Sequence, residues 1–308
     1  MHKHGFKETV FADKLNCFRF FDADTVSSEI DRCLEDCQRE VHMWGEANQV
    51  TFEPSKESFH VLHPRCPAGG SFKMLGLIFD PKLLMDAAAH EVAAVAGSRL
   101  KAILRCRRFF PTSSLVNMYK SQVLSYIEAR TPGLHHAPDF FLQPVDGVQA
   151  KFLVEIGLSP EEALLDHNLA PLKARRDISM LGFLHRISIG DAPREFEAMF
   201  PLQSARSFNR GWAVNACRHD RQLRDPIDGT HTGMMERSVF GLVYCYNCLP
   251  QSVVDIKTVN GFQRALQKAL KLAIQSGLSN WKLFLKNGAR SSGWSFFQKM
   301  FAKQDFPG

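Results

Sequence analysis

The sequence predicts an α+β fold, in which a small N-terminal segment with strands precedes a mainly helical region. Two short apolar runs flank an acidic tip between Glu8 and Phe18, which is the pattern of a tight β-hairpin. Beyond Pro81, apolar residues recur at helical spacing in several long segments. The 308 residues, of which 45% are hydrophobic and 23% charged, are typical of a globular protein large enough for two modest domains.

The hairpin is followed by an amphipathic helix and then by further strands. Asp24 and Thr25 are candidate capping residues for this helix, and Gly45 is its expected end. The strand-like segments after it are Gln49–Phe52, Ser58–Leu62 and Phe72–Phe79. A hairpin followed by a helix that crosses over a sheet fits half of a ferredoxin-like layer.

The region after Pro81 is expected to be helical. Helices are predicted over residues 84–108, 113–129, 143–156, 172–189 and 253–276, and another begins at Pro160. Residues 238–245 fit either a buried strand or the start of a helix. We therefore predict four parts: a strand-containing part (1–80), a helical part (81–200), a linker or mobile loop (201–235) and a helical C-terminal part (236–308).

The net charge and the cysteines indicate which partners and which cellular compartment to expect. A net charge of +6 permits binding to nucleic acid without proving it. The eight cysteines are widely spread and no secretory signal precedes them, which favours a reduced intracellular setting, nuclear or cytoplasmic. No apolar run approaches the roughly 18 residues of a membrane-spanning helix, so no membrane partner is expected.

Five segments together resemble the C-terminal part of the reverse transcriptases of jockey-like non-LTR retrotransposons. They are Phe11-Ala12-Asp13-Lys14 in the hairpin, the stretch from Trp44-Gly45 to Ser58, Phe72–Asp80 with its Leu-Gly pair, a helical stretch from Tyr119 to Ile178, and a tail from Tyr246-Asn247-Cys248-Leu249-Pro250 to Leu266. No single segment is specific. Their common order, between about residues 8 and 275, carries the resemblance.

The resemblance implies an incomplete polymerase palm over residues 1–80 and a thumb-like helical region after it. The chain would then be a truncated RNA-directed DNA polymerase, a nucleotidyltransferase, whose N-terminal portion is missing. In the intact family, carboxylates at the hairpin tip and on an upstream strand hold two Mg²⁺ ions that stabilise the attacking and leaving oxygens. Asp13 would be the catalytic, metal-binding residue of this hairpin.

The same resemblance implies that the catalytic site is broken. Lys14 stands where the family has a second Asp, and one carboxylate beside an ammonium is a poor Mg²⁺ site. We therefore expect a pseudoenzyme that holds no Mg²⁺ and does not polymerise alone. Lys56, the second catalytic residue that the resemblance implies, would lie near the nucleotide triphosphate and act in proton transfer. Lys73 and Gly76 would lie near the primer strand. Alternatively, Lys56 and Lys73 are solvated surface lysines and Gly76 is a bulge glycine.

A basic run in the long helix after Pro81 is the best surviving binding candidate. Its members, which include no acid, are Arg99, Lys101, Arg105, Arg107 and Arg108. Lys101, Arg105 and Arg108 share one face, which could lie against the phosphates of RNA or an RNA–DNA hybrid. A solvated cationic face on a core helix would explain the run equally well. A second, weaker basic cluster consists of Arg175, Arg176 and Arg186.

Metal-ligand patterns are weak in this chain. Cys245 and Cys248 have CxxC spacing. Together with Cys217 and His219 they have the number and types of ligand of a Cys₃His zinc site. Unrelated buried cysteines explain the spacing better. A weaker set is His60, His63 and Cys66, and the pair His135-His136 fits a helix end better than a ligand pair.

Three functional hypotheses follow. The first is an inactive reverse-transcriptase remnant that keeps some affinity for nucleic acid. The second is a helical interaction or scaffold protein without a nucleic-acid role. The third is one piece of a longer polymerase, which an upstream reading frame with an aspartate-bearing strand would support. Salt-dependent binding to nucleic acid, and its loss on charge reversal at Arg105 and Arg108, separates the first from the second.

Overall fold

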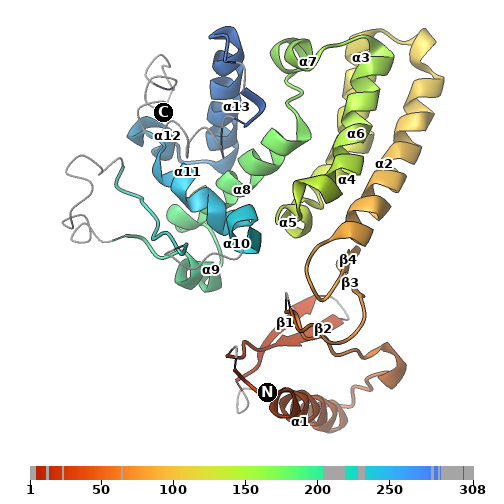
Figure 1. The fold of residues 1–308 in the computed structure, drawn as a ribbon, viewed down its shortest axis with the longest axis vertical. Coiled ribbons are helices and arrows are strands. Elements are labelled where there is room, and N and C mark those ends of the chain that lie inside the picture. The colour runs from red at the N-terminus through yellow and green to blue at the C-terminus, as the bar shows by residue number, and fades with distance from the viewer. Residues whose placement is uncertain are drawn as a thin grey trace. The chain divides into compact units, whose positions relative to one another are not determined.

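The protein is α+β and mostly helical, with two small two-stranded sheets. The computed structural model describes residues 5–11, 14–22, 24–63, 65–203, 219–227, 233–278, 281–283, 285 and 301. The chain divides into two compact units, Met1–Phe72 and Lys73–Gly308, and each is described by itself. Figure 1 shows the elements of both units.

The first unit contains the predicted hairpin and the predicted helix, and both are confirmed. Strands β1 (Lys7–Phe11) and β2 (Lys14–Phe18) pair antiparallel. Phe11 pairs with Lys14, so two residues connect the strands, as a tight hairpin requires. Helix α1 (Ser27–Ala47) follows. Within the described part of the chain, β1 and β2 pair only with each other, so each strand has an unpaired edge.

Helix α1 differs from the prediction at both ends. It begins after Val26 with no side-chain cap, so neither Asp24 nor Thr25 caps it. It also continues through Gly45. This glycine does not end the helix but allows the backbone of Val50 and the ring of Phe52 to approach closely. A Cβ atom at Gly45 would lie 2.6 Å from the carbonyl oxygen of Val50.

The predicted strands after α1 are wrong in part. Residues 49–52 form no strand, and 58–62 contribute only an isolated bridge between Val61 and Ala68. A short 3₁₀ helix, η2 (Pro54–Lys56), lies between them. The predicted strand 72–79 is instead two short paired strands, β3 (Phe72–Met74) and β4 (Leu77–Phe79).

After the β3–β4 hairpin, the second unit is built from helices, as the periodicity predicted (Figure 1). Its first part contains α2 (Asp86–Arg105), η3 (Arg107–Phe109), α3 (Thr112–Tyr119), the π-helical turn η4 (Lys120–Leu124), α4 (Ser125–Glu128), α5 (Thr131–Leu134), α6 (Asp139–Ile156) and α7 (Pro160–His167). Its second part contains α8 (Leu172–Ser188), α9 (Arg194–Met199), α10 (Gly233–Arg237), η6 (Val239–Leu242), α11 (Val243–Asn247), α12 (Gln251–Val254), α13 (Val259–Gln275) and η7 (Trp281–Leu283).

Two hydrophobic clusters form the core of this unit. One gathers buried side chains of α2, α3, α6 and their neighbours, with Tyr119 stacked on Phe152 at 4.3 Å between ring centres. The other gathers those of α8, α11 and α13, including Tyr246 and Phe262. Leu172 at the start of α8 belongs to the first cluster and Leu181 to the second, so this helix connects them.

Local signals explain two further features of the second unit. Ser159 and Glu162 form a reciprocal capping box at the start of α7, which agrees with the predicted helix start at Pro160. Of the predicted linker 201–235, residues 219–227 are packed within the second unit. The Asn247 side chain accepts a hydrogen bond from the backbone N–H of buried Leu223 and donates one to its carbonyl oxygen. Residues 204–218 and 228–232 lie outside the described residues.

In the described part of the chain, no helix combines the length and the apolar character needed to cross a membrane.

Candidate nucleic-acid interface

The basic run lies at the C-terminal end of α2 and in the short helix after it. Arg99, Lys101 and Arg105 belong to α2, whereas Arg107 and Arg108 belong to η3. Because Cys106 ends α2, the shared helical face predicted for Lys101, Arg105 and Arg108 holds only for the first two. Leu100, on the neighbouring face, is buried, which fixes the cationic face outward.

Two of the five cations are used within the fold. The Arg99 guanidinium donates to the carbonyl oxygen of Gln122 at 2.9 Å and lies 4.3 Å from the centre of the Tyr126 ring. Arg107 forms an ion pair of 3.3 Å with Glu155 on α6. These two side chains attach the end of α2 to neighbouring helices, so they are less free to bind a ligand.

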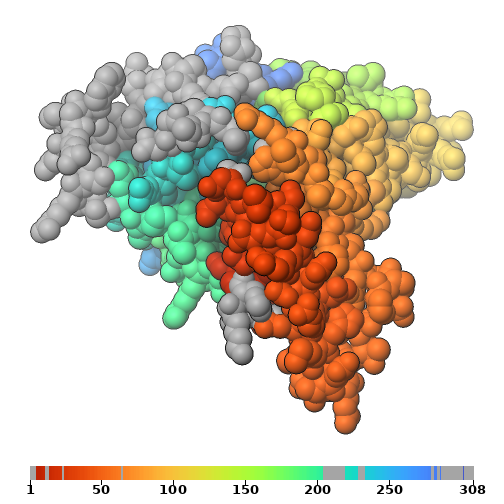
Figure 2. Space-filling model, turned by 60° about the horizontal axis from the view of Figure 1, so that its bottom comes forward, coloured from red at the N-terminus to blue at the C-terminus, as the bar shows by residue number. Residues whose placement is uncertain are grey.

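Lys101, Arg105 and Arg108 are exposed, and none has an acidic partner among the described residues. Arg108 lies 5.4 Å from the ring centre of Phe109, which is itself 73% exposed. Phe110 is 42% exposed. Figure 2 shows the chain around residue 105, coloured yellow, at the outer edge of the second unit. We call Lys101, Arg105, Arg108, Phe109 and Phe110 the basic end.

Cations beside exposed aromatic rings are a chemistry suited to a nucleic-acid strand. Ammonium and guanidinium groups neutralise phosphates, and an exposed phenyl ring offers a stacking surface to an unpaired base. The basic end has both kinds of group within ten residues of chain.

Lys73 and Gly76 lie in and beside the β3–β4 hairpin. Lys73 forms an ion pair of 3.2 Å with Glu91 of α2. Gly76 has a φ of 81° and the preceding Leu75 a φ of 49°, which is the left-handed pair of a type I′ turn. Gly76 is thus a turn glycine and does not form a bulge.

Of the two residues predicted to act in the polymerase site, the structure describes Lys56 but not Asp13. Lys56 ends η2 and is exposed, and its side chain has no hydrogen bond or ion pair with any described residue. Asp13, the predicted catalytic and Mg²⁺-binding residue, lies outside the described residues, as does the neighbouring Ala12. Lys14 begins β2 directly after them.

The second basic cluster is neutralised by acids. Arg175 pairs with Glu128 at 2.5 Å, Arg176 with Asp146 at 2.6 Å, and Arg186 with Asp191 at 3.4 Å. The first two partners lie more than 25 residues away in sequence, so periodicity could not reveal them. Arg175 and Arg176 therefore join helices, Arg186 pairs locally after the end of α8, and all three cations have an acidic partner.

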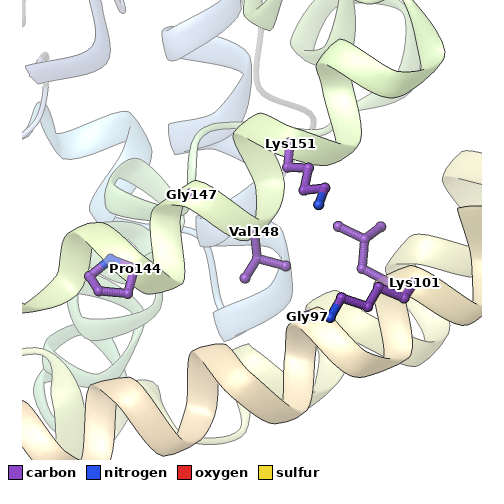
Figure 3. Close-up of a pocket in the computed structure, with 7 residues that line it drawn as sticks. Gly97, Lys101, Pro144, Gly147, Val148 and Lys151 are labelled. Atoms are coloured by element: carbon purple, nitrogen blue, oxygen red, sulfur yellow. The ribbon is translucent and has the colours of Figure 1, made fainter.

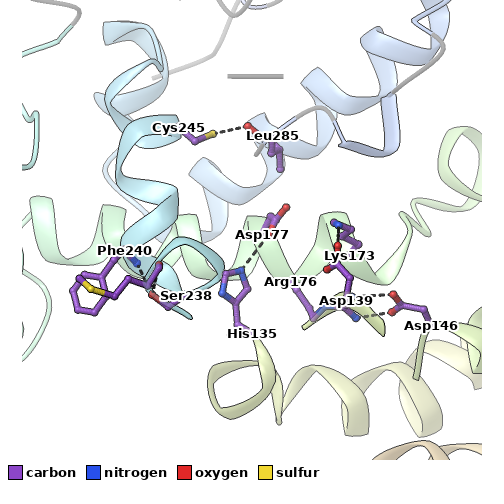
Figure 4. Close-up of polar contacts among 11 residues, drawn as sticks. His135, Asp139, Asp146, Lys173, Arg176, Asp177, Ser238, Phe240, Cys245 and Leu285 are labelled. Atoms are coloured by element: carbon purple, nitrogen blue, oxygen red, sulfur yellow. Dashed lines mark hydrogen bonds and ion pairs between the residues drawn. The ribbon is translucent and has the colours of Figure 1, made fainter. Parts of the chain in front are cut away.

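The histidine and cysteine patterns have structural roles. The His63 ring accepts hydrogen bonds from the backbone of Arg65 and Cys66. Cys245 is buried and donates from its thiol to the carbonyl oxygen of Leu285 at 3.0 Å (Figure 4). Cys217 lies outside the described residues. Among the residues that the structure describes, no three His, Cys, Asp or Glu side chains form a group that could hold a metal ion.

The structure also shows a buried polar pair that the sequence did not predict. His135 follows α5, and its Nε2 lies 3.1 Å from Oδ1 of Asp177 on α8 (Figure 4). Both side chains are almost fully buried. Burial, together with His135 and Arg237 nearby, lowers the pKa of the adjacent His136, which keeps that imidazole neutral. The sequence pointed only to a helix end here.

No protein-family model matches this chain, and the searches of curated proteins and of solved structures gave no match either. The reverse-transcriptase resemblance therefore stays a prediction from the five sequence segments.

Proposed function

We propose that the chain binds nucleic acid, preferring RNA or an RNA–DNA hybrid, through the basic end of its second unit. One observation carries this proposal: Lys101, Arg105 and Arg108 are exposed and free of acidic partners in the described structure, beside exposed Phe109 and Phe110. The other arginines considered and Lys73 form ion pairs or hydrogen bonds within the fold, and Lys56 is a single exposed lysine in the first unit. A polyanion is the ligand class that such a surface favours.

We further propose that this affinity is inherited from a reverse-transcriptase-like polymerase. The supporting features are the sequence order of the five segments, a tight hairpin followed by a long helix, and the helices after β4. The ancestral reaction is RNA-templated DNA synthesis with Mg²⁺. With Lys14 at the hairpin, we expect this chain alone to extend no primer, even when Mg²⁺ and deoxynucleotides are supplied.

The direct test is fluorescence anisotropy of a labelled RNA–DNA hybrid across a salt series. We expect affinity to fall steeply as salt rises, and the Arg105→Glu/Arg108→Glu variant to lose binding. The matched control is Lys82→Glu/Lys257→Glu, which changes the net charge equally at two exposed lysines outside the basic end. If both double variants lose binding equally, the attraction is non-local and the basic end is not the site.

A second candidate function is protein–protein interaction through the first unit. Exposed apolar side chains occur along this unit, among them Val10 on β1, Phe20, and Met43 and Trp44 on α1. Exposed apolar side chains form interaction surfaces where they gather into one patch. Salt-insensitive nucleic-acid binding together with self-association in analytical ultracentrifugation, lost in Met43→Lys/Trp44→Lys, would put this function first.

A further inference from the structure

A groove lies beside the basic end, between α2 and α6 (Figure 3). Its volume is about 200 Å³, and its lining residues are Gly97, Leu100, Lys101, Pro144, Gly147, Val148 and Lys151. The members from α6 follow the i, i+3, i+4, i+7 spacing of one helical face. On α2, Gly97, Lys101 and Arg105 follow one another at intervals of one turn, so the groove is continuous with the basic end.

The two glycines keep the groove open. A Cβ atom added at Gly97 or Gly147 would meet nothing within 4 Å, whereas at Gly133 it would approach Leu77 closely. Neither Gly97 nor Gly147 has a positive φ. Packing and backbone conformation thus require neither glycine, although each costs a helix interior roughly 0.5–1 kcal/mol relative to alanine. What both provide is space at the groove floor.

The chemistry of the groove is cationic at its edges and apolar inside. Lys101 from α2 and Lys151 from α6 are both exposed, and neither has an ion pair with a described residue. No acid lines the groove. Glu155, one turn from Lys151, is already paired with Arg107. The apolar wall consists of Leu100, Pro144 and Val148.

We propose that this groove seats the sugar–phosphate backbone of one nucleic-acid strand. Lys101 and Lys151 contact phosphates, and a sugar lies against the open floor at Gly97 and Gly147. This inference rests on the proposed function, because the strand reaches the groove from the basic end. It adds Lys151, a residue from a different helix, to the interface. Because contacts to phosphate and sugar carry no sequence information, recognition here is independent of the bases.

The sharpest test fills the floor without removing any charge. The Gly97→Ala/Gly147→Ala variant should be more stable to heat than the parent chain, since alanine favours helix and neither methyl group clashes. We nevertheless expect it to bind the RNA–DNA hybrid about tenfold more weakly, a factor equivalent to about 1.4 kcal/mol. Ser98→Ala is the matched control, because it adds helix propensity on α2 outside the groove lining.

The lysines provide a second, independent measurement. Each phosphate contact contributes about −0.9 to the slope of log K against log salt on a duplex. Lys101→Gln/Lys151→Gln should therefore reduce that slope by about 2, whereas Lys82→Gln/Lys257→Gln should leave it unchanged. The groove variants should lose as much affinity for a strand with abasic sites as for a normal strand, because the groove contacts no bases.

The outcomes separate this inference from the proposed function. If Arg105→Glu/Arg108→Glu abolishes binding while the glycine variant and Lys151→Gln bind normally, the groove is not used and the basic end still stands. If none of these variants changes binding, both proposals fail. If the glycine variant does not fold, Lys151→Gln still tests the groove, because replacing this exposed side chain disturbs no described contact.

Discussion

Arg176 on α8 donates two parallel hydrogen bonds to Asp146 on α6, from Nη1 to Oδ1 at 2.6 Å and from Nη2 to Oδ2 at 2.9 Å (Figure 4). The Arg176 side chain is 7% exposed, so its charge is satisfied inside the protein. Such bidentate pairs are stronger than neutral hydrogen bonds and fix the orientation of both groups. This pair attaches the helix that connects the two hydrophobic clusters to one wall of the groove.

Replacing Asp146 with alanine should be strongly destabilising, because it leaves the buried Arg176 charge without a partner. We expect a loss of about 2–3 kcal/mol in the free energy of unfolding, measured by urea denaturation. The control is Asp36→Ala, which removes the acidic partner of the exposed Arg39 and should cost no more than about 0.5 kcal/mol. Equal losses for the two variants would contradict a structural role for the Arg176–Asp146 pair.

His185 is the centre of a second buried connection. It is fully buried, its Nε2 lies 2.7 Å from the carbonyl oxygen of Ile256, and its ring stacks on Phe262. A carbonyl oxygen only accepts, so Nε2 carries the proton. Nδ1, 3.2 Å from the hydroxyl of Tyr246, is then the acceptor in the neutral ring. Burial is the main cause that lowers the pKa of His185.

This network makes stability depend on pH. The folded-state pKa of His185 lies below its unfolded value of about 6.5. The neutral ring therefore contributes its full stabilisation to the fold above about pH 6.5, and this stabilisation is lost as the pH falls to the folded-state pKa. The pKa of His136 is also lowered in the folded state, so its contribution to stability is lost over the same direction of pH change. We expect the free energy of unfolding to drop as the pH falls below the unfolded-state value of about 6.5, and to drop less in His185→Gln. An identical drop in the variant would exclude His185 as a source.

Gly45 should tolerate no side chain. A Cβ atom there would lie 2.6 Å from the Val50 carbonyl oxygen and 2.8 Å from Phe52. Although alanine favours helix, Gly45→Ala should destabilise α1 by about 1–3 kcal/mol, since the backbone must move. Hydrogen exchange of the α1 amides is the measurement. Gly70→Ala is the control, because its Cβ would meet nothing within 4 Å. Slower exchange in Gly45→Ala would contradict this packing.

Long periodic segments allowed the helices to be predicted. The expected helix 172–189 corresponds to Leu172–Ser188, because its apolar positions recur over almost five turns. Helix α6 begins at Asp139, four residues earlier than expected, and contains Pro144 in its second turn. The strands at 49–52 and 58–62 failed because a strand requires a pairing partner. Here Phe52 packs at Gly45, and His60 stacks on Phe72.

The candidate interface was predictable only as a run of charge. Sequence cannot tell that Arg99 is bonded at Gln122, or that Arg107 pairs with Glu155 almost 50 residues away. It also gave no sign of Lys151, because the groove depends on how α2 and α6 pack. Which cations stay free is a property of tertiary packing, whereas their local clustering is a property of the sequence.

The β3–β4 turn provides the last prediction. Leu75 has a φ of 49°, a left-handed conformation that costs an ordinary residue roughly 1–2 kcal/mol, and its side chain is 63% exposed. Asparagine adopts this conformation readily, and Asn-Gly is the preferred pair for a type I′ turn. Leu75→Asn should therefore stabilise the hairpin by about 1 kcal/mol, whereas β-branched Leu75→Val should destabilise it. Hydrogen exchange of residues 77–79 measures both variants. If both speed up exchange equally, the Leu75 side chain contributes a stabilising contact that outweighs its backbone strain.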